Sequence, residues 1–145
     1  MKLMQKKQDY IIIVGCGRLG ANLANTLSDN DGNVLIMDTS KDSFRRLSSD
    51  FGGLSLVGSG TDLTDLHSAQ IEKASAVIAV TNDDNTNIMI VQLAREMFHV
   101  SRVIARLYDP DRESVYQELG IDTICPAILS AKEVDKLLEN CGKEK

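Results

Sequence analysis

Cysteine is scarce in this chain, and its positions are scattered. Only three of the 145 residues are cysteine, at Cys16, Cys125 and Cys141, and no two of them form a Cys-x-x-Cys pair. An odd number at irregular spacing indicates neither a disulfide framework nor a zinc site. Such usage is typical of a protein kept in a reducing compartment.

Positive charge and long apolar runs are also lacking. The formal net charge is −5, so the basic footprint of a nucleic-acid-binding domain is absent and we expect no nucleic-acid partner. Lys2, Lys6 and Lys7 gather near the N-terminus, but so few charges are typical of a solvated tail. No stretch approaches the roughly 18 apolar residues that cross a bilayer, and no secretory signal is visible. We therefore expect a soluble protein whose role at any membrane comes through a partner.

The chain has the length of one domain, with enough residues to bury a proper core. Residues 1–9 and 141–145 are polar and are predicted to be tails. Residues 10–140 are predicted to form one folded unit.

The stretch from Tyr10 to Gly20 organises this unit. Ile11 to Val14 is a continuous β-branched run, as expected for a strand buried on both faces of a parallel sheet. A Gly-x-Gly-x-x-Gly loop follows at 15–20 and leads directly into a helical pattern. In such a loop the first glycine permits a tight turn, the second lets a pyrophosphate approach the backbone, and the third lets the helix pack closely on the sheet. The positive end of the helix would hold the phosphates.

A carboxylate stands at the expected distance from this loop. Asn33 to Met37 is predicted to be a second buried strand, and Asp38 ends it, about 20 residues after the glycines. A carboxylate there can accept both ribose hydroxyls and repels a 2′-phosphate. The alternative is a ligand-free turn followed by a capping Asp, but strand, loop, helix, strand and acid in this order favour nucleotide binding.

Strand and helix patterns alternate six times along the chain. This alternation predicts an α/β fold: a doubly wound, Rossmann-type sheet of six parallel strands in the order 3-2-1-4-5-6, with helices on both faces. The later strands are predicted at 54–57, 76–80, 102–107 and 121–125.

Four of the helix predictions are specific enough to test. A helix capped by Thr39 or Ser40 is expected to bury Phe44, Leu47 and Phe51. A short helix is expected to carry Leu63, Leu66 and Ile71. A helix starting at Asp109-Pro110 is expected to turn Tyr116 and Leu119 inward and to end at Gly120. A last helix is expected from Pro126 to about residue 139, and its apolar stripe would hold Ile128, Ala131, Val134 and Leu138.

Ligands of doubly wound sheets bind at the carboxyl ends of the strands, where the strand order reverses. There Asp38 would take the ribose, residues 59–63 would border the adenine side, and Thr81 with Asn82 would approach the far half of the ligand. The candidate binding residues are Gly15, Cys16, Gly17, Arg18, Leu19, Gly20, Asp38, Thr39, Ser40, Gly58, Ser59, Thr61, Asp62, Leu63, Thr81, Asn82, Asp83, Asn85 and Arg106.

Two arginines and one cysteine in this set leave alternatives open. Arg18 is either a phosphate ligand or a solvated residue of the first helical turn, and its place inside the glycine loop favours the phosphate. Arg106 lies on an apolar strand, so it needs either an acidic partner or a phosphate. Cys16 sits at a helix N-terminus, which lowers a thiol pKa and allows a redox sensor, but a small residue chosen for fit is the favoured interpretation.

Four blocks occur together in order: the glycine loop with Asp38, Gly-Ser-Gly-Thr-Asp at 58–62, Ala-Val-Ile-Ala-Val-Thr-Asn-Asp-Asp-Asn-Thr-Asn at 76–87, and Val-Ile-Ala-Arg-Leu-Tyr-Asp-Pro at 103–110. Over residues 9–138 the chain closely resembles the RCK N-terminal (KTN, TrkA-N) domain of Trk- and Ktr-type potassium-uptake regulators. The resemblance implies a cytoplasmic regulatory subunit, peripheral to the membrane through its potassium transporter or channel. It also implies homodimers that build ring-like oligomers, and NAD(H) or an adenine nucleotide (ATP, ADP or AMP) as ligand.

By position, the resemblance assigns the phosphates to the glycine loop with Arg18, the ribose to Asp38, and the adenine side to Thr61 and Asp62. Thr81, Asn82 and Arg106 would line the rest. The family often has Asp where this chain has Ser59. Many members also carry a C-terminal ligand-sensing domain after this region. Two alternatives stay open: a stand-alone nucleotide domain that works with a longer two-domain RCK protein, or a piece of a longer chain.

A small NAD-dependent oxidoreductase is the alternative function. Hydride transfer needs a substrate pocket and a general acid or base, which a second domain normally supplies. Neither Tyr108 nor Tyr116 has a Lys four positions later, so the short-chain dehydrogenase pairing is absent. We therefore expect a nucleotide-binding regulator and not an enzyme.

Overall fold

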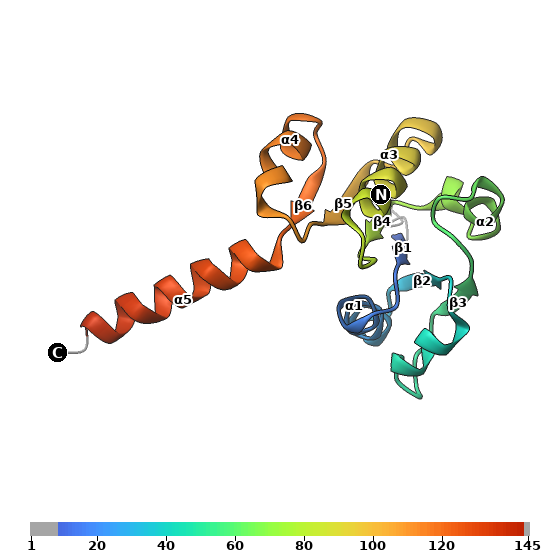
Figure 1. Cartoon of the computed structure of the whole chain (residues 1–145). Coiled ribbons are helices and arrows are strands. Elements are labelled where there is room, and N and C mark those ends of the chain that lie inside the picture. Colours follow the sequence, from blue (N-terminus) through green and yellow to red (C-terminus); the bar gives the residue numbers. More distant parts are fainter. Residues whose placement is uncertain (1–8, 144–145) are drawn as a thin grey trace, which may run out of the picture.

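Six parallel strands form a single sheet in the order β3-β2-β1-β4-β5-β6, in a computed structural model that describes residues 9–143 (Figure 1). The first and last parts of the predicted tails, residues 1–8 with their three lysines and residues 144–145, lie outside the described residues. The strand order and the parallel pairing confirm the predicted doubly wound sheet. The strands are β1 (Tyr10–Val14), β2 (Asn33–Asp38), β3 (Leu54–Val57), β4 (Ala76–Ala79), β5 (Arg102–Arg106) and β6 (Asp122–Ile124).

Helices cover both faces of the sheet, as predicted. On one face, α1 packs with the 3-10 helix η1 on a cluster that includes Ile13, Val34 and Ile36. On the other face, α2 and α3 cover a larger cluster that includes Ile12 and Met37. The α-helices are α1 (Arg18–Asp29), α2 (Leu63–Ser68), α3 (Asp84–Phe98), α4 (Glu113–Glu118) and α5 (Pro126–Lys143), and the 3-10 helices are η1 (Lys41–Arg46), η2 (Ile71–Lys73) and η3 (Pro110–Arg112).

The central strands are buried because their residues alternate between these two clusters. Ile13 of β1 lies between Ile36 of β2 and Ile78 of β4 in the parallel register. Ile12, Ile13 and Ile36 are fully buried. Removing each such side chain from water contributes about 1.5–3 kcal/mol to folding.

The predicted helix after β2 is wrong in type and length, since only η1, a six-residue 3-10 helix, forms there. Local polar groups compete with an α-helix in this segment: the Ser40 N–H donates to Asp38 Oδ1 at 2.8 Å, and the Ser48 hydroxyl donates to Asp50 at 2.7 Å. The expected inward residues Phe44, Leu47 and Phe51 still pack against the α1-side cluster.

Two smaller differences concern short helices. The helix expected to carry Leu63, Leu66 and Ile71 ends at Ser68, because Gln70 takes a left-handed conformation with φ 57° and Ile71 begins η2. In α4, Tyr116 packs on the core as predicted, but Leu119 is 47% exposed and that prediction is wrong. The chain turns at Gly120 (φ 75°), which caps the helix as predicted, and Ile121 takes the buried position.

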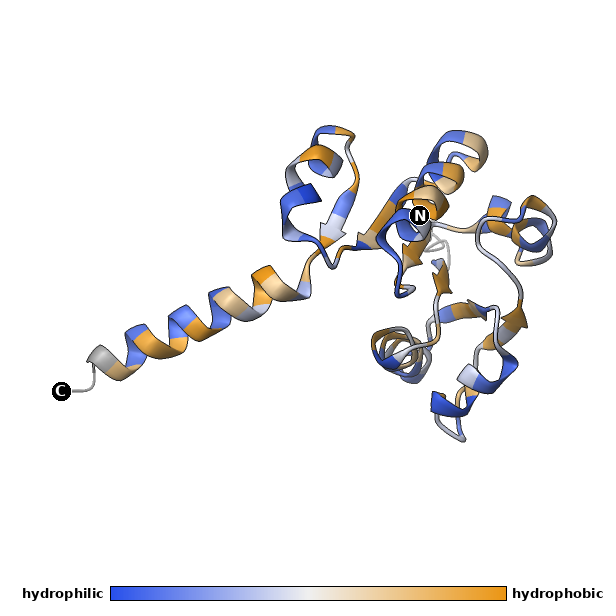
Figure 2. Ribbon diagram, in the orientation of Figure 1, coloured by the Kyte–Doolittle hydropathy of each residue, from blue (hydrophilic) through white to orange (hydrophobic). Residues whose placement is uncertain are grey.

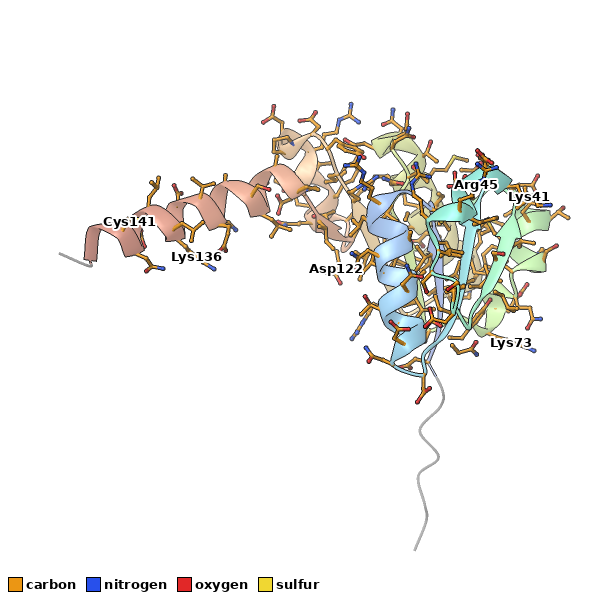
Figure 3. All side chains as sticks on the ribbon, turned by 90° about the horizontal axis from the view of Figure 1, so that it is seen from below. Lys41, Arg45, Lys73, Asp122, Lys136 and Cys141 are labelled. Atoms are coloured by element: carbon orange, nitrogen blue, oxygen red, sulfur yellow. The ribbon has the colours of Figure 1, made fainter. Side chains whose placement is uncertain are left out.

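The last helix leaves the body of the molecule. α5 begins at Pro126 as predicted but continues to Lys143, and it points away from the sheet (Figure 1). Ile128 packs against the core, whereas every residue from Leu129 to Cys141 is exposed. Apolar and polar residues share this free helix, and its side chains project into open space (Figures 2 and 3). No helix of the described residues 9–143 has both the length and the apolar character needed to cross a membrane.

Candidate functional site

A cleft of about 540 Å³ opens at the carboxyl ends of the strands. It lies where β1 runs between β2 and β4, the point at which the strand order reverses and where doubly wound sheets bind their ligands. Its lining comes from the ends of the strands, from the loops after the first four strands, and from α1, η1 and α3. The lining residues are Val14, Gly15, Cys16, Gly17, Arg18, Asp38, Thr39, Ser43, Arg46, Gly58, Ser59, Gly60, Val80, Thr81, Asn82, Thr86, Ile90, Arg106 and Tyr108.

The three glycines of the loop differ in what surrounds them. Gly15 has φ 112°, and a Cβ there would lie 2.8 Å from the backbone of Val80. A Cβ on Gly20 would lie 1.8 Å from the carbonyl oxygen of Gly15, so only glycine lets α1 approach the loop this closely. A Cβ on Gly17 would meet nothing within 4 Å. Gly17 thus leaves open space at the cleft, where a ligand can approach the backbone.

The N-terminus of α1 faces this open space with unsatisfied donors. Gly17 is the N-cap, no side chain caps the helix, and the first turn holds no acidic residue. The first intrahelical bond runs from the Ala21 N–H to the Gly17 carbonyl at 2.9 Å, so the earlier N–H groups of the turn have no partner within the helix. Free N–H groups at the positive end of a helix dipole form an anion site.

Asp38 links the end of β2 to the glycine loop. Its Oδ2 accepts the Cys16 N–H at 2.8 Å, and its Oδ1 accepts the Ser40 N–H at 2.8 Å. Each carboxylate oxygen offers two lone pairs, so each keeps one for a further donor such as a ribose hydroxyl. The carboxylate is therefore held in place and still able to accept from a ligand.

Cys16 is buried between these groups. Its thiol donates to the Ser43 carbonyl at 3.3 Å. Burial, with a further contribution from the negative charge of Asp38, raises the pKa of the Cys16 thiol, and the nearby charge of Arg46 opposes this only in part. The environment therefore keeps Cys16 in its unreactive thiol form, in contrast to a redox-sensing cysteine with a lowered pKa.

The loop after β3 serves the cleft and α2 at once. Gly58 and Ser59 line the cleft, whereas Thr61, Asp62 and Leu63 do not. The Thr61 hydroxyl lies 2.9 Å from that of Ser59, and Asp62 caps α2 by accepting the Asp65 N–H at 3.1 Å. Asp62 therefore serves α2, whereas Thr61 supports the cleft-lining Ser59 from behind the lining.

A buried amide fixes the loop after β4. Asn87 is fully buried on α3, and its Oδ1 accepts the N–H and the hydroxyl of Thr81 at 2.9 and 2.6 Å. Its Nδ2 donates to the carbonyls of Thr81 and Arg106 at 3.1 and 3.0 Å. One side chain thus ties the ends of β4 and β5 together beneath Thr81.

Arg106 has partners that the sequence did not suggest. Its Nη2 donates to the carbonyls of Val80 and Thr81 at 2.9 and 2.7 Å, and its guanidinium lies 4.7 Å from the centre of the Tyr108 ring. Backbone carbonyls and an aromatic face therefore stabilise this charge, and among the described residues no carboxylate pairs with it. Its contact with a phosphate stays a prediction. Within residues 9–143 its buried Nε has no hydrogen-bond partner.

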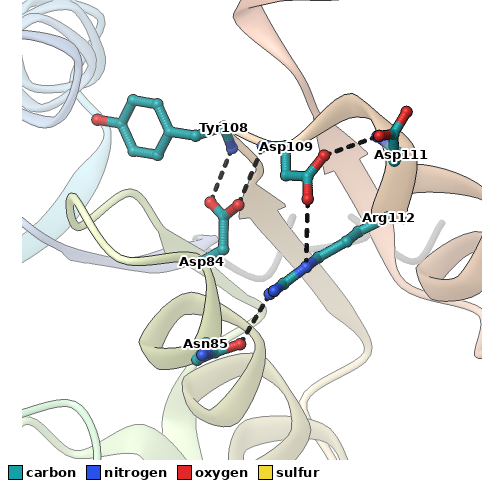
Figure 4. A network of polar contacts seen from close by, with 6 residues as sticks. All are labelled: Asp84, Asn85, Tyr108, Asp109, Asp111 and Arg112. Carbon is teal, nitrogen blue, oxygen red and sulfur yellow. Dashed lines mark hydrogen bonds and ion pairs between the residues drawn. The ribbon is translucent and has the colours of Figure 1, made fainter.

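A second polar network joins the start of α3 to the chain after β5 (Figure 4). Asp84 accepts the N–H groups of Tyr108 and Asp109 at 2.7 and 3.0 Å, and Arg112 bridges Asn85 and Asp109. Asp83 caps α3, and the bond from the Thr86 N–H helps to hold the pKa of Asp83 below its usual value. Asp83 and Asn85 thus organise the helix start and do not line the cleft.

The structure brings eleven of the candidate residues together around the cleft: Gly15, Cys16, Gly17, Arg18, Asp38, Thr39, Gly58, Ser59, Thr81, Asn82 and Arg106. The candidates outside the lining are Leu19, Gly20, Ser40, Thr61, Asp62, Leu63, Asp83 and Asn85. The sequence analysis missed Ser43 and Arg46 because it placed them on an α-helix, and it also missed Thr86 and Tyr108. One signal in the sequence could have indicated that Arg46 lies near the cleft: it follows Asp38 closely along the chain.

Comparison with known proteins gives a consistent result. The family model described as the TrkA-N domain matches residues 11–126. The Trk system potassium uptake protein TrkA of Streptomyces coelicolor is 44% identical over 135 residues, which cover 93% of this chain and 60% of that protein. This chain thus spans about three fifths of the length of the first curated relatives that it matches.

Solved structures share the architecture. The TrkA-N domain of the inner membrane protein ybaL from Escherichia coli superposes with a TM-score of 0.79 at 23% identity, over 90% of this chain and 96% of that one, which is a likeness of fold. A structure of GsuK bound to ADP matches with a TM-score of 0.76 at 26% identity, over 94% of this chain and 35% of that one.

Proposed function

This chain belongs to the TrkA-N domain family, as its resemblance predicted, and from that membership we propose that it is a nucleotide-binding regulator of a potassium uptake system. Its functional domain comprises residues 10–140. It binds NAD(H) or an adenine nucleotide (ATP, ADP or AMP) in the cleft. It acts on a membrane potassium transporter or channel from the cytoplasmic side.

The observation that carries this proposal is the uncapped N-terminus of α1 beside Asp38. The open space at Gly17 and the unpaired N–H groups suit phosphates, and the remaining lone pairs of Asp38 suit ribose hydroxyls. The related GsuK is described as bound to ADP, which supports the same class of ligand here.

Regulation through this cleft requires two states with different affinities for the ligand, because a ligand shifts an equilibrium only by that difference. Nucleotides that differ in phosphate number, or nicotinamides that differ in oxidation state, supply such differences. The networks of Asn87 and Asp84 connect the loop after β4 to the chain that leads to α5, and they would transmit the change.

We also infer that the protein works as an oligomer, with α5 as the contact. Leu129, Val134, Leu137 and Leu138 are 53–66% exposed. In the part of the chain that the structure describes, the helix is free of the core after Ile128. A helix with such a face gains stability by packing against another helix or sheet, and a second copy of the same chain is the simplest partner. Homodimers of this kind could build a ring beneath the transporter, either alone or with a longer two-domain relative.

An oxidoreductase is the less favoured function. Among residues 9–143, the lining of the cleft contains no histidine or lysine, and its only carboxylate is Asp38, which already accepts two backbone N–H groups. The raised pKa of Cys16 also argues against a redox sensor. We propose a regulator without catalytic activity.

Calorimetric titration with NAD+, NADH, ATP, ADP and AMP tests the proposal. We expect at least one of them to bind and expect Asp38→Asn to weaken that binding roughly tenfold, since it removes a charged acceptor from the ribose. Asp42→Asn is the matched control, because Asp42 lies on η1 and pairs outward with Arg45. Binding of none of these nucleotides, or turnover of NADH with a small carbonyl substrate, would contradict the proposal.

A further inference from the structure

Arg46 is a cleft-lining cation with unused hydrogen-bond donors. It ends η1 and lines the cleft beside Gly17, Asp38 and Ser43. Its one hydrogen bond to the described residues runs from Nη1 to the Cys16 carbonyl at 3.4 Å, which is longer than an ordinary N–H···O bond of about 2.9 Å. A guanidinium has five N–H donors, so most of its capacity is available to a ligand.

The other arginines of this region are engaged or differently placed. Arg106 is held by two carbonyls and the ring of Tyr108. Arg45, the neighbour of Arg46, forms an exposed ion pair with Asp42 at 3.1 Å. Within residues 9–143, by contrast, no carboxylate lies within ion-pair distance of Arg46. Arg18 stands exposed at the start of α1, beyond the glycine that separates it from Cys16.

Arg46 and Asp38 bind the backbone of the same residue of the glycine loop, Cys16, through two successive peptide groups. Asp38 accepts the Cys16 N–H, and Arg46 donates to the Cys16 carbonyl. Their charges act in opposite directions on the Cys16 thiol, because Asp38 raises its pKa and Arg46 lowers it. An acceptor for sugar hydroxyls and a donor for an anion therefore stand side by side, and this pairing matches a sugar that carries a phosphate.

We propose that Arg46 is a ligand-binding residue that recognises the 5′-phosphate attached to the ribose held by Asp38. This inference rests on the proposed nucleotide binding and assigns to Arg46 the discrimination between a nucleotide and its nucleoside. The 5′-phosphate is favoured over a 2′-phosphate because a 2′-phosphate would lie against the Asp38 carboxylate, which repels it. Guanidinium suits the role, since it binds phosphate oxygens through two parallel N–H donors.

Calorimetry with AMP and adenosine tests the assignment in four proteins: wild type, Arg46→Gln, Arg46→Lys and Arg45→Gln. We expect the wild type to prefer AMP over adenosine and Arg46→Gln to lose roughly ten- to hundredfold in AMP affinity, with adenosine affinity kept within about twofold. Arg46→Lys should recover part of the loss. Arg45→Gln should bind both ligands like the wild type, because Arg45 does not line the cleft. The exposed position of Arg46 lets all four fold, which thermal melts check.

Each of the other outcomes would overturn the assignment and would indicate a different role for Arg46 or a different function for the cleft. Equal weakening of AMP and adenosine in Arg46→Gln would make Arg46 a structural residue of the loop. Unchanged AMP binding would exclude contact with the phosphate. A wild-type preference for NADP+ over NAD+ that Arg46→Gln abolishes would move the contact to the 2′-phosphate. Failure of the wild type to bind any of these nucleotides would overturn the proposed function itself, whereas nucleotide binding untouched by Arg46→Gln overturns only the role of Arg46.

Discussion

At the scale of single residues, two glycines of the same loop have different roles: Gly20 is needed for the fold, and Gly17 is predicted to be needed for ligand binding. A methyl group on Gly20 would lie 1.8 Å from the Gly15 carbonyl oxygen, so Gly20→Ala must push α1 away from the loop. We expect it to lower the free energy of unfolding by about 2–3 kcal/mol, measured by urea denaturation. A methyl group on Gly17 meets no protein atom within 4 Å, so Gly17→Ala should lower stability by about 1 kcal/mol or less.

The same substitution at Gly17 should affect the ligand strongly. If phosphates approach the backbone here, the methyl group takes their place, and nucleotide affinity in calorimetry should fall roughly tenfold or more. Gly17→Ala is the informative variant because it is expected to remain folded. Affinity equal to that of the wild type would show that phosphates bind elsewhere.

The pKa of Cys16 gives a prediction with a defined sign. Because the pKa of the folded thiol is raised above its unfolded value of about 8.5, burial of Cys16 contributes its full stability below that pH. The contribution is lost as the pH rises through the folded pKa. We expect the difference in unfolding free energy between wild type and Cys16→Ala to narrow above about pH 8.5, measured by urea denaturation across pH. A constant difference from pH 7 to 10 would contradict the raised pKa.

The site residues that could be predicted from the sequence are those required by the backbone geometry of the glycine loop. The glycine spacing and Asp38 follow from the demands of a strand-loop-helix turn, and both lie at the cleft. Asn87 and Arg46 do not follow from any pattern. The role of Asn87 depends on four partners contributed by Thr81 and Arg106, and that of Arg46 on a contact with Cys16 across 30 positions. Only the folded chain brings such groups together.

At the scale of elements, Asp84 is the joint between α3 and the chain after β5. Its two carboxylate oxygens accept the N–H groups of Tyr108 and Asp109 (Figure 4). Asp84→Asn replaces one acceptor by an NH₂ group that would face an N–H donor. We expect a loss of about 1–3 kcal/mol in unfolding free energy and faster amide hydrogen exchange at Tyr108, Asp109 and the following η3 and α4, measured by mass spectrometry.

Asp111→Asn is the control for this joint. Asp111 lies in the same loop and is exposed, and the contact it makes in this network is through its backbone N–H. Its substitution should leave exchange unchanged. If both variants exchange alike, the two bonds of Asp84 do not hold this segment.

The elements that the sequence predicted best were the buried ones. Both faces of the four central strands are covered, so these strands are recognisable in the sequence as apolar runs. They are β2, β1, β4 and β5. The segment after β2 was harder, since Ser40 and Ser48 find local partners that compete with an α-helix. Helical spacing of Phe44, Leu47 and Phe51 indicated which residues face inward, and this was correct, but it did not fix the type of helix.

At the scale of the whole molecule, the strand order was predictable and the direction of α5 was not. Alternating strands and helices with short connections leave few topologies, and the right-handed crossover rule selects among them. The stripe of apolar residues on α5 would suit packing on its own sheet or on another chain equally well. The helix leaves the sheet after Ile128 (Figure 1), and this direction favours packing on another chain.

If α5 binds a second copy of the chain, one charge on its apolar face should separate the copies. Leu138 is 66% exposed, so Leu138→Asp costs little packing within the chain itself but would bury a carboxylate in the contact between copies. We expect light scattering to find a dimer or larger for the wild type and monomer for Leu138→Asp, and expect the melting temperature to rise with concentration only in the wild type. Glu139→Lys is the control, since residue 139 points away from the side of the helix that carries the four exposed apolar residues, and the change should leave the assembly intact. A wild type that is monomeric at high concentration, or a Leu138→Asp variant that still dimerises, would show that α5 is not the contact.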